Sequence, residues 1–137
     1  MNPAPMPAIA ALYAGLIGLL LIVLAVPISR MRTSLKIGIG DGGDKRLARA
    51  IRAHANAVEW ALPALLLLLL AELNRAPHLF LHGCGVALVV GRVLHASGIS
   101  RTGGPSFGRF TGTALTWFVV IALALWDIWA FARFLLV

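Results

Sequence analysis

Hydrophobic residues gather in four long stretches, separated by short segments that carry most of the charged positions. The stretches cover about residues 8–28, 47–73, 79–99 and 110–136. Each is long enough to cross a bilayer, which takes about 20 apolar residues in a helix. Leucine and alanine dominate, and strand-like alternation is absent. Because a lipid-embedded backbone must satisfy its own hydrogen bonds, the pattern predicts an all-α integral membrane protein. We expect a bundle of four transmembrane helices that forms one domain over residues 1–137.

The composition agrees with a membrane protein and argues against a soluble domain. Hydrophobic residues make up 60% of the chain and charged residues 12%, whereas about a quarter of residues are charged in a soluble protein. The net charge is +7, but the basic residues lie beside apolar segments, which favours contacts with anionic membrane lipids over nucleic acid. The single cysteine, Cys84, cannot form an intrachain disulfide, so a stapled secreted fold is excluded.

The connectors differ in charge and therefore predict an orientation. The connector at 73–78 holds only Arg75, and the connector at 100–109 holds Arg101 and Arg109. The segment 30–52 is far more basic, with Arg30, Arg32, Lys36, Lys45, Arg46, Arg49 and Arg52. Because positively charged loops stay in the cytoplasm, the first and third connectors are predicted to be cytoplasmic and both termini non-cytoplasmic.

A glycine-rich stretch lies in the first connector. Residues 38–44 read Gly-Ile-Gly-Asp-Gly-Gly-Asp. They lack the Gly-Lys-Ser/Thr ending of a phosphate-binding loop and follow no strand. We therefore predict a flexible turn, with Asp44 as the N-cap of the second helix.

Polar residues cluster at the start of the second helix, where charge near hydrocarbon is costly and usually faces a protein interior or a cavity. At about 100° per residue, Arg52, Asn56 and Glu59 fall on one face of this helix. Arg49 lies at the edge of that face, and His54 points to roughly the opposite side. The shared face is therefore the best candidate for a ligand site.

Two further helices contribute arginines at the same predicted level. Arg92 lies on the third helix, and Arg109 begins the fourth. Under the predicted topology both belong to the cytoplasmic half of the bundle, with Arg52, Asn56 and Glu59. One polar pocket near the cytoplasmic face would accommodate all five residues.

The side chains in this group indicate the kind of ligand. Guanidinium groups match carboxylates and phosphates with paired hydrogen bonds, and a carboxylate such as that of Glu59 matches an ammonium group. A peptide-like zwitterion with more than one anionic group fits this set. An arginine beside a thiol would also favour the thiolate, because positive charge lowers the pKa of a thiol.

The residues alone leave a structural interpretation open. Arg92 and Glu59 could form an interhelical ion pair, whereas Arg52 and Glu59 are seven residues apart and need not meet. The polar cluster would then be a buried structural network. The histidines show no metal-ligand spacing, and Cys84 adds little, so no metal site is expected.

The segment Arg52–Glu59, with Arg-Ala-x-x-Asn-x-x-Glu spacing and followed by Pro63 and a leucine run, resembles the second-helix signature of the MAPEG family. These are membrane-associated proteins in eicosanoid and glutathione metabolism. The sequence Gly-Arg-Val-Leu-His at 91–95 is similar to the third-helix motif of the family, and Arg109 stands where the family places an arginine at the start of the fourth helix. The resemblance extends over nearly the whole chain.

This resemblance implies a homotrimer of four-helix protomers, with glutathione bound between neighbouring subunits. Arg52 would hold a glutathione carboxylate, Glu59 would meet its amino group, and Asn56 would hydrogen-bond nearby. Arg92 would support the site from the third helix. Arg109 would be the catalytic residue that stabilises the thiolate.

Two positions depart from the family pattern. Ile99 stands where the eicosanoid-synthesising enzymes have a tyrosine, and Ala55 stands where a second basic residue sometimes precedes the asparagine. Both changes remove side chains that would contact the tripeptide, and they argue against eicosanoid synthesis. The chain is therefore similar to simpler bacterial members, for which the inner membrane is the expected location.

The predicted function is that of a membrane glutathione-binding protein of the glutathione transferase or peroxidase type. Glutathione would be the co-substrate, and the partner substrate would be a lipophilic electrophile. The alternative is a non-catalytic membrane protein that binds an anionic lipid or small acid, with a structural polar cluster.

Overall fold

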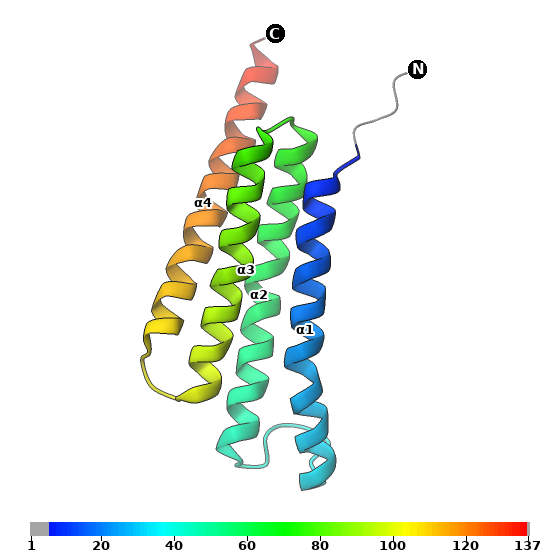
Figure 1. The fold of residues 1–137 in the computed structure, drawn as a ribbon, viewed down its shortest axis with the longest axis vertical. Helices are drawn as coiled ribbons and strands as arrows, with labels where there is room; N and C mark the ends of the chain where they lie inside the picture. Colours follow the sequence, from blue (N-terminus) through cyan, green and yellow to red (C-terminus); the bar gives the residue numbers. More distant parts are fainter. Residues whose placement is uncertain (1–5, 137) are drawn as a thin grey trace.

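Four antiparallel helices make up the protein in a computed structural model that describes residues 6–136 (Figure 1). They are α1 (Ala8–Leu35), α2 (Lys45–Leu73), α3 (His78–Arg101) and α4 (Phe107–Leu135). All four are long and apolar enough to cross a membrane, which confirms the predicted fold class of the protomer. Helices α2 and α3 lie in the middle, and α1 and α4 flank them without touching each other within the described residues.

Two helices, α1 and α4, extend beyond a predicted bound by three residues or more, whereas α2 and α3 stay within two residues of theirs. The apolar pattern ended α1 at residue 28, but the helix continues to Leu35 and closes at Lys36, whose φ of 55° is left-handed. Cations at a helix C-terminus interact favourably with its dipole, so the basic residues prolong the helix instead of ending it. At the other end of the chain, α4 begins at Phe107 because the Ser106 side chain caps it, accepting from the Arg109 N–H at 3.4 Å.

The connector between α1 and α2 forms the predicted turn. Gly40, Gly42 and Gly43 all have positive φ, which glycine adopts without steric cost. Asp44 is the predicted N-cap, and its carboxylate accepts from the backbone N–H groups of Arg46 at 2.8 Å and Leu47 at 3.0 Å. These hydrogen bonds, first that of Leu47 and then that of Arg46, hold the pKa of Asp44 below its usual value.

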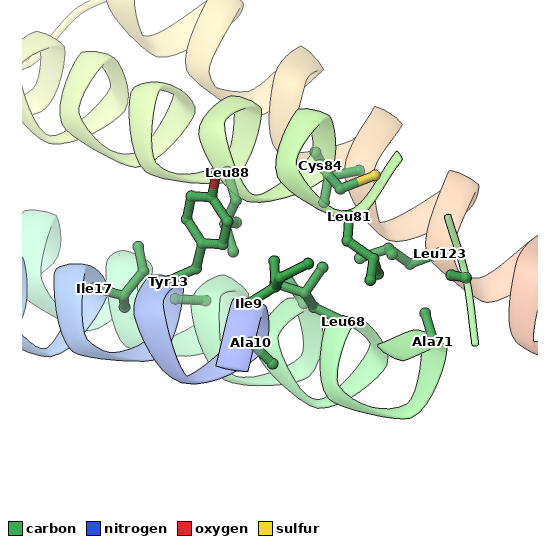
Figure 2. Packing of buried hydrophobic residues seen from close by; sticks show 14 residues of the cluster. Ile9, Ala10, Tyr13, Ile17, Leu68, Ala71, Leu81, Cys84, Leu88 and Leu123 are labelled. Carbon is green, nitrogen blue, oxygen red and sulfur yellow. The ribbon is translucent and has the colours of Figure 1, made fainter. Parts of the chain in front are cut away.

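The main hydrophobic core lies at the end of the bundle where α1 begins and α4 ends. Figure 2 shows Tyr13 of α1 reaching between the helices toward Leu88 of α3. The Tyr13 ring lies directly against Gly85, where a Cβ would collide with it. Its hydroxyl oxygen lies 2.9 Å from His82 Nδ1 and 3.2 Å from the His82 carbonyl. The only tyrosine of the chain is thus a core residue.

Glutamate 72 secures the start of α1. Its two carboxylate oxygens accept from the backbone N–H groups of Ile9 at 3.0 Å and Ala10 at 2.7 Å. The first N–H groups of a helix have no intrahelical partner, and an anion at this end also opposes the helix dipole favourably. Glu72 therefore ties the end of α2 to the start of α1 and belongs to the scaffold.

Helix α2 faces the bundle with small residues. The buried alanines on this face are Ala53, Ala57, Ala61, Ala64 and Ala71. Their spacing of three, four or seven residues keeps them on one side of the helix. Neighbouring helices can therefore approach closely, and the polar residues of α2 lie around the sides of this buried stripe.

Candidate functional site

Arg52 and Glu59 form an ion pair along the outer surface of α2. The distance from Arg52 Nη1 to Glu59 Oε1 is 3.3 Å, and the two side chains are 63% and 49% exposed. Seven residues correspond to about 10.5 Å along a helix axis, and the long arginine side chain covers this separation. The predicted shared face is correct, and the two side chains also meet directly. Such an exposed pair adds little stability, so it can open for a ligand at little cost.

Asn56, between these two residues, turns toward the bundle interior. Its side-chain oxygen accepts from Arg92 Nη1 at 3.0 Å, and its backbone carbonyl lies 3.4 Å from the same nitrogen. Arg92 also donates from Nη2 to the Gly112 carbonyl at 3.3 Å. One side chain on α3 therefore connects α2 to α4.

Arg92 is a buried cation that has no acidic partner among residues 6–136. Only 2% of the residue is exposed, and its Nε has no hydrogen-bond partner within the described residues. Glu59 pairs with Arg52, so the interhelical Arg92–Glu59 pair considered from sequence is wrong. Burying a charge with only neutral acceptors is costly, which gives this end of the bundle a strong preference for a negative group.

Arg109 is held at the start of α4 by the loop that precedes it. Its Nη1 donates to the carbonyl oxygens of Gly104 at 2.7 Å and Gly103 at 3.3 Å. Gly98 of α3 makes this placement possible, because a Cβ there would lie 2.7 Å from both the Arg109 backbone nitrogen and the Ser106 hydroxyl oxygen. The hydrogen bonds to the loop involve only Nη1, so an arginine with five N–H donors keeps capacity for a ligand.

Two cavities meet at Arg109. One, of about 210 Å³, lies between the starts of α2 and α4 and the end of α3; Arg49, Arg52, Ile99 and Arg109 line it. The other, of about 460 Å³, is lined by His95, Arg109 and the loop between α3 and α4. Three arginine side chains therefore converge within one protomer, at the end of the bundle that holds the first and third connectors.

The structure groups the predicted residues in two neighbouring sets. Arg52 and Arg109 share a cavity, and Arg52 pairs with Glu59; Asn56 and Arg92 form a more buried contact behind them. Ile99, at the position of the missing tyrosine, is a buried apolar wall of the shared cavity.

Two residues contribute more to the cavities than the sequence pattern indicates. Arg49 was placed at the edge of the polar face, yet it lines the smaller cavity. His95 was identified only as part of the third-helix motif, yet it is buried and borders the larger cavity with Arg109. The signal for Arg49 was present, because it precedes Arg52 by three residues and so lies one turn away on a helix.

An apolar cavity of about 280 Å³ lies far from the arginines. It is formed by the start of α1 and the leucine run of α2, including Ala10, Leu65 and Leu69. These leucines are about 20–25 Å along α2 from Arg52. Because it lacks the polar groups that orient a ligand, this cavity is not a candidate for the chemistry.

Comparison with known proteins identifies the family. The model of the MAPEG family matches residues 10–129. The chain belongs to the MAPEG family. It is also 36% identical over 121 residues to two Escherichia coli proteins, from strains K12 and O6:H1 (CFT073), each called inner membrane protein YecN; the match covers 88% of this chain and 91% of each relative.

These findings establish the class of protein. The four long apolar helices make this MAPEG protein an integral membrane protein, and together with the YecN relatives they support a location in the inner membrane. The names of the relatives state no activity.

Proposed function

We propose that this protein binds glutathione at the arginine end of the bundle and conjugates it, through its sulfur, to a lipophilic electrophile drawn from the membrane. The thiol loses its proton, the new bond joins sulfur to the electrophilic carbon, and either that carbon releases its leaving group or the adduct takes up a proton. The observation that carries the proposal is the cavity shared by Arg52 and Arg109, together with the Glu59 carboxylate two turns farther along α2. Membership of a family associated with glutathione supports this choice of ligand.

Each polar residue has a role in this proposal. The tripeptide opens the exposed Arg52–Glu59 pair, so that its ammonium group meets Glu59 and a carboxylate meets Arg52. Asn56 hydrogen-bonds nearby. Arg92 orients the Asn56 side chain through the 3.0 Å hydrogen bond and adds positive charge from behind.

Arg109 is the proposed catalytic residue. Its free N–H groups would stabilise the glutathione thiolate, which is the nucleophile that attacks the electrophile. The glycine-lined loop and the Ser106 cap hold the guanidinium before substrate arrives, so little reorganisation is needed. Catalysis then consists of positioning and thiolate stabilisation, without a metal or a covalent enzyme intermediate.

A homotrimer, in which neighbouring subunits complete the site, is part of the proposal. Arg52 and Glu59 lie on an outer face of α2 that also presents exposed leucines, including Leu62 and Leu66. An exposed face of this kind suits contact with a second copy. We place both termini outside the cytoplasm and the arginine end on the cytoplasmic side, because the basic first connector belongs to that end.

Ultraviolet thiolate absorbance tests the proposed reaction. Adding glutathione to purified protein at pH 7 should produce a thiolate signal, although a thiol with a pKa near 8.5 is only about 3% ionised at that pH. We expect Arg109→Ala to lose most of the signal, because the variant no longer lowers the pKa of the glutathione thiol. Lowering that pKa by two units corresponds to about 2.7 kcal/mol of thiolate stabilisation.

Arg101→Ala is the matched control, because Arg101 is an exposed arginine at the end of α3. This variant should keep the wild-type signal. No thiolate and no binding at millimolar glutathione in the wild-type protein would rule out the proposed function.

The second candidate is a non-catalytic membrane protein that binds an anionic lipid or small acid. The observation in its favour is that the polar groups already satisfy one another: Arg52 pairs with Glu59, and Arg92 bonds to Asn56 and Gly112. In this case the cluster would chiefly connect helices.

Glu59→Gln separates the two candidates. We expect its unliganded thermal stability to stay close to wild type, because exposed ion pairs contribute only about 0–1 kcal/mol. Its stabilisation by added glutathione should fall, since a ligand that binds only the folded state raises stability by mass action. A variant that unfolds or dissociates early, in a protein whose stability glutathione does not change, would favour the structural candidate.

A further inference from the structure

Arg49 lines the candidate site from the first turns of α2. It lies one helical turn before Arg52, and both side chains line the cavity of about 210 Å³ that Arg109 also borders. The three arginines come from α2 and α4, whereas Ile99 and Thr102 close the cavity from the end of α3 and the residue after it.

The Arg49 side chain has unused hydrogen-bonding capacity. Its Nε is buried and has no hydrogen-bond partner within residues 6–136. Buried polar groups normally have partners, and an unpaired N–H of a guanidinium is most readily satisfied by an anion. In the part of the chain that the structure describes, no acidic side chain lines this cavity, and Glu59, which pairs with Arg52, lies outside it. The cavity therefore carries an excess of positive charge.

The size of the cavity limits what enters it. Pockets that enclose a whole small ligand usually measure about 300–1,000 Å³, so a cavity of about 210 Å³ takes only part of one. The positive charge of the cavity selects an anionic group. The apolar side chain of Ile99 offers no hydrogen bond to other polar parts of a ligand. A single carboxylate at the end of a longer ligand meets both conditions.

The spacing along α2 identifies which carboxylate. Arg49 and Glu59 are ten residues apart, or about 15 Å along the helix axis. An extended tripeptide spans about 10 Å, and long side chains cover the rest. If Glu59 meets the ammonium group at one end of glutathione, the carboxylate within reach of Arg49 is the one at the other end, on glycine.

We infer that Arg49, with Arg52, forms a subsite for the glycine carboxylate of glutathione beside Arg109, and that Arg49 is a binding residue that selects ligands with a free carboxylate there. The inference rests on the proposed glutathione site, and it names the residue that makes this site specific for a free carboxylate. Arg49 then donates from Nε and a terminal nitrogen to the two carboxylate oxygens, and the ligand spans α2 from Glu59 to Arg49.

Paired ligands and variants test this subsite. Binding of glutathione and of its glycine monoethyl ester is measured by calorimetry on wild-type protein, Arg49→Gln and Arg46→Gln. Arg46 is the matched control, because it lies on the same helical turn with a side chain that is 77% exposed and pairs with Asp44. The wild-type protein should bind the ester about 10–100-fold more weakly than glutathione, as expected for the loss of a charge-assisted bond.

Arg49→Gln should bind glutathione more weakly by up to the same factor. Its preference for the acid over the ester should be smaller than that of the wild-type protein, although Arg52 remains in the subsite. Arg46→Gln should behave like the wild-type protein. Arg49→Lys keeps the positive charge but lacks the paired N–H donors of a guanidinium. This variant should recover part of the affinity, which separates ligand binding from a folding defect.

The outcomes distinguish the subsite from the proposed function. If the wild-type protein binds glutathione but Arg49→Gln still prefers the acid to the ester by the full factor, the subsite is wrong and the function stands. If the wild-type protein binds neither ligand, both proposals are wrong.

Discussion

Replacing Gly112 with alanine is expected to destabilise the protein by about 1–3 kcal/mol, the usual cost of overpacking a tight interior contact. The added Cβ would lie 2.7 Å from His95 Cβ and would also meet the carbonyl oxygen of Gly91. Backbone atoms of α3 cannot move aside as the end of a flexible side chain can. Helices α3 and α4 must therefore separate at this point.

The separation should also disturb the candidate site. The Gly112 carbonyl accepts from Arg92 at 3.3 Å and from the Thr116 hydroxyl at 2.8 Å, so a shift of α4 weakens the contact that places Arg92. We expect a lower midpoint of thermal unfolding in detergent micelles, together with weaker glutathione binding.

Gly83→Ala is the matched control for this substitution. Gly83 also lies within a helix, but a Cβ there meets nothing within 4 Å. Alanine is favoured over glycine in a helix by about 1 kcal/mol, so this variant should be as stable as wild type or more stable. Equal stability of Gly112→Ala and Gly83→Ala would contradict the close α3–α4 contact.

Replacing Arg92 with alanine is expected to cost about 2–5 kcal/mol, the range for removing a large buried side chain without refilling the space. The residue is 2% exposed and connects α2 to α4 through Asn56 and Gly112. Its removal leaves a cavity, and it also leaves the side-chain oxygen of Asn56 without a hydrogen-bond donor. Thermal unfolding of the purified variant measures the loss, and Arg101→Ala, at the exposed end of the same helix, should show none.

Arg92→Met separates the shape of this side chain from its charge. Replacing a buried charge with an apolar residue of similar volume is often neutral or stabilising. We therefore expect Arg92→Met to recover much of the stability that Arg92→Ala loses, while the thiolate signal with glutathione stays low. Full thiolate formation in Arg92→Met would show that the positive charge of Arg92 does not support the ligand.

Several local features followed from the sequence because they depend on neighbours in the chain. The Asp44 cap needs only the backbone N–H groups two and three residues later, and the shared face of Arg52 and Glu59 follows from helical periodicity. The end of α1 did not follow, because basic side chains interrupt an apolar pattern without interrupting a helix.

The composition of the candidate site depended on contacts between helices. The distance from Arg92 to Asn56, and the convergence of Arg49 with Arg109, arise from how α2, α3 and α4 approach one another. A sequence reports which side of its own helix a residue occupies, but not the rotation of that helix against its neighbours. The sequence therefore left open an ion pair between Arg92 and Glu59, whereas Arg92 contacts Asn56.

The sequence by itself determined a four-helix membrane protein of the MAPEG family, because apolar length, helical periodicity and a local signature are properties of the chain. Only the tertiary structure decided that Arg92 is buried behind the site and that Arg49 enters it. The physical reason is close approach: Gly98 and Gly112 allow α3 and α4 to touch, and that contact sets where the arginines meet.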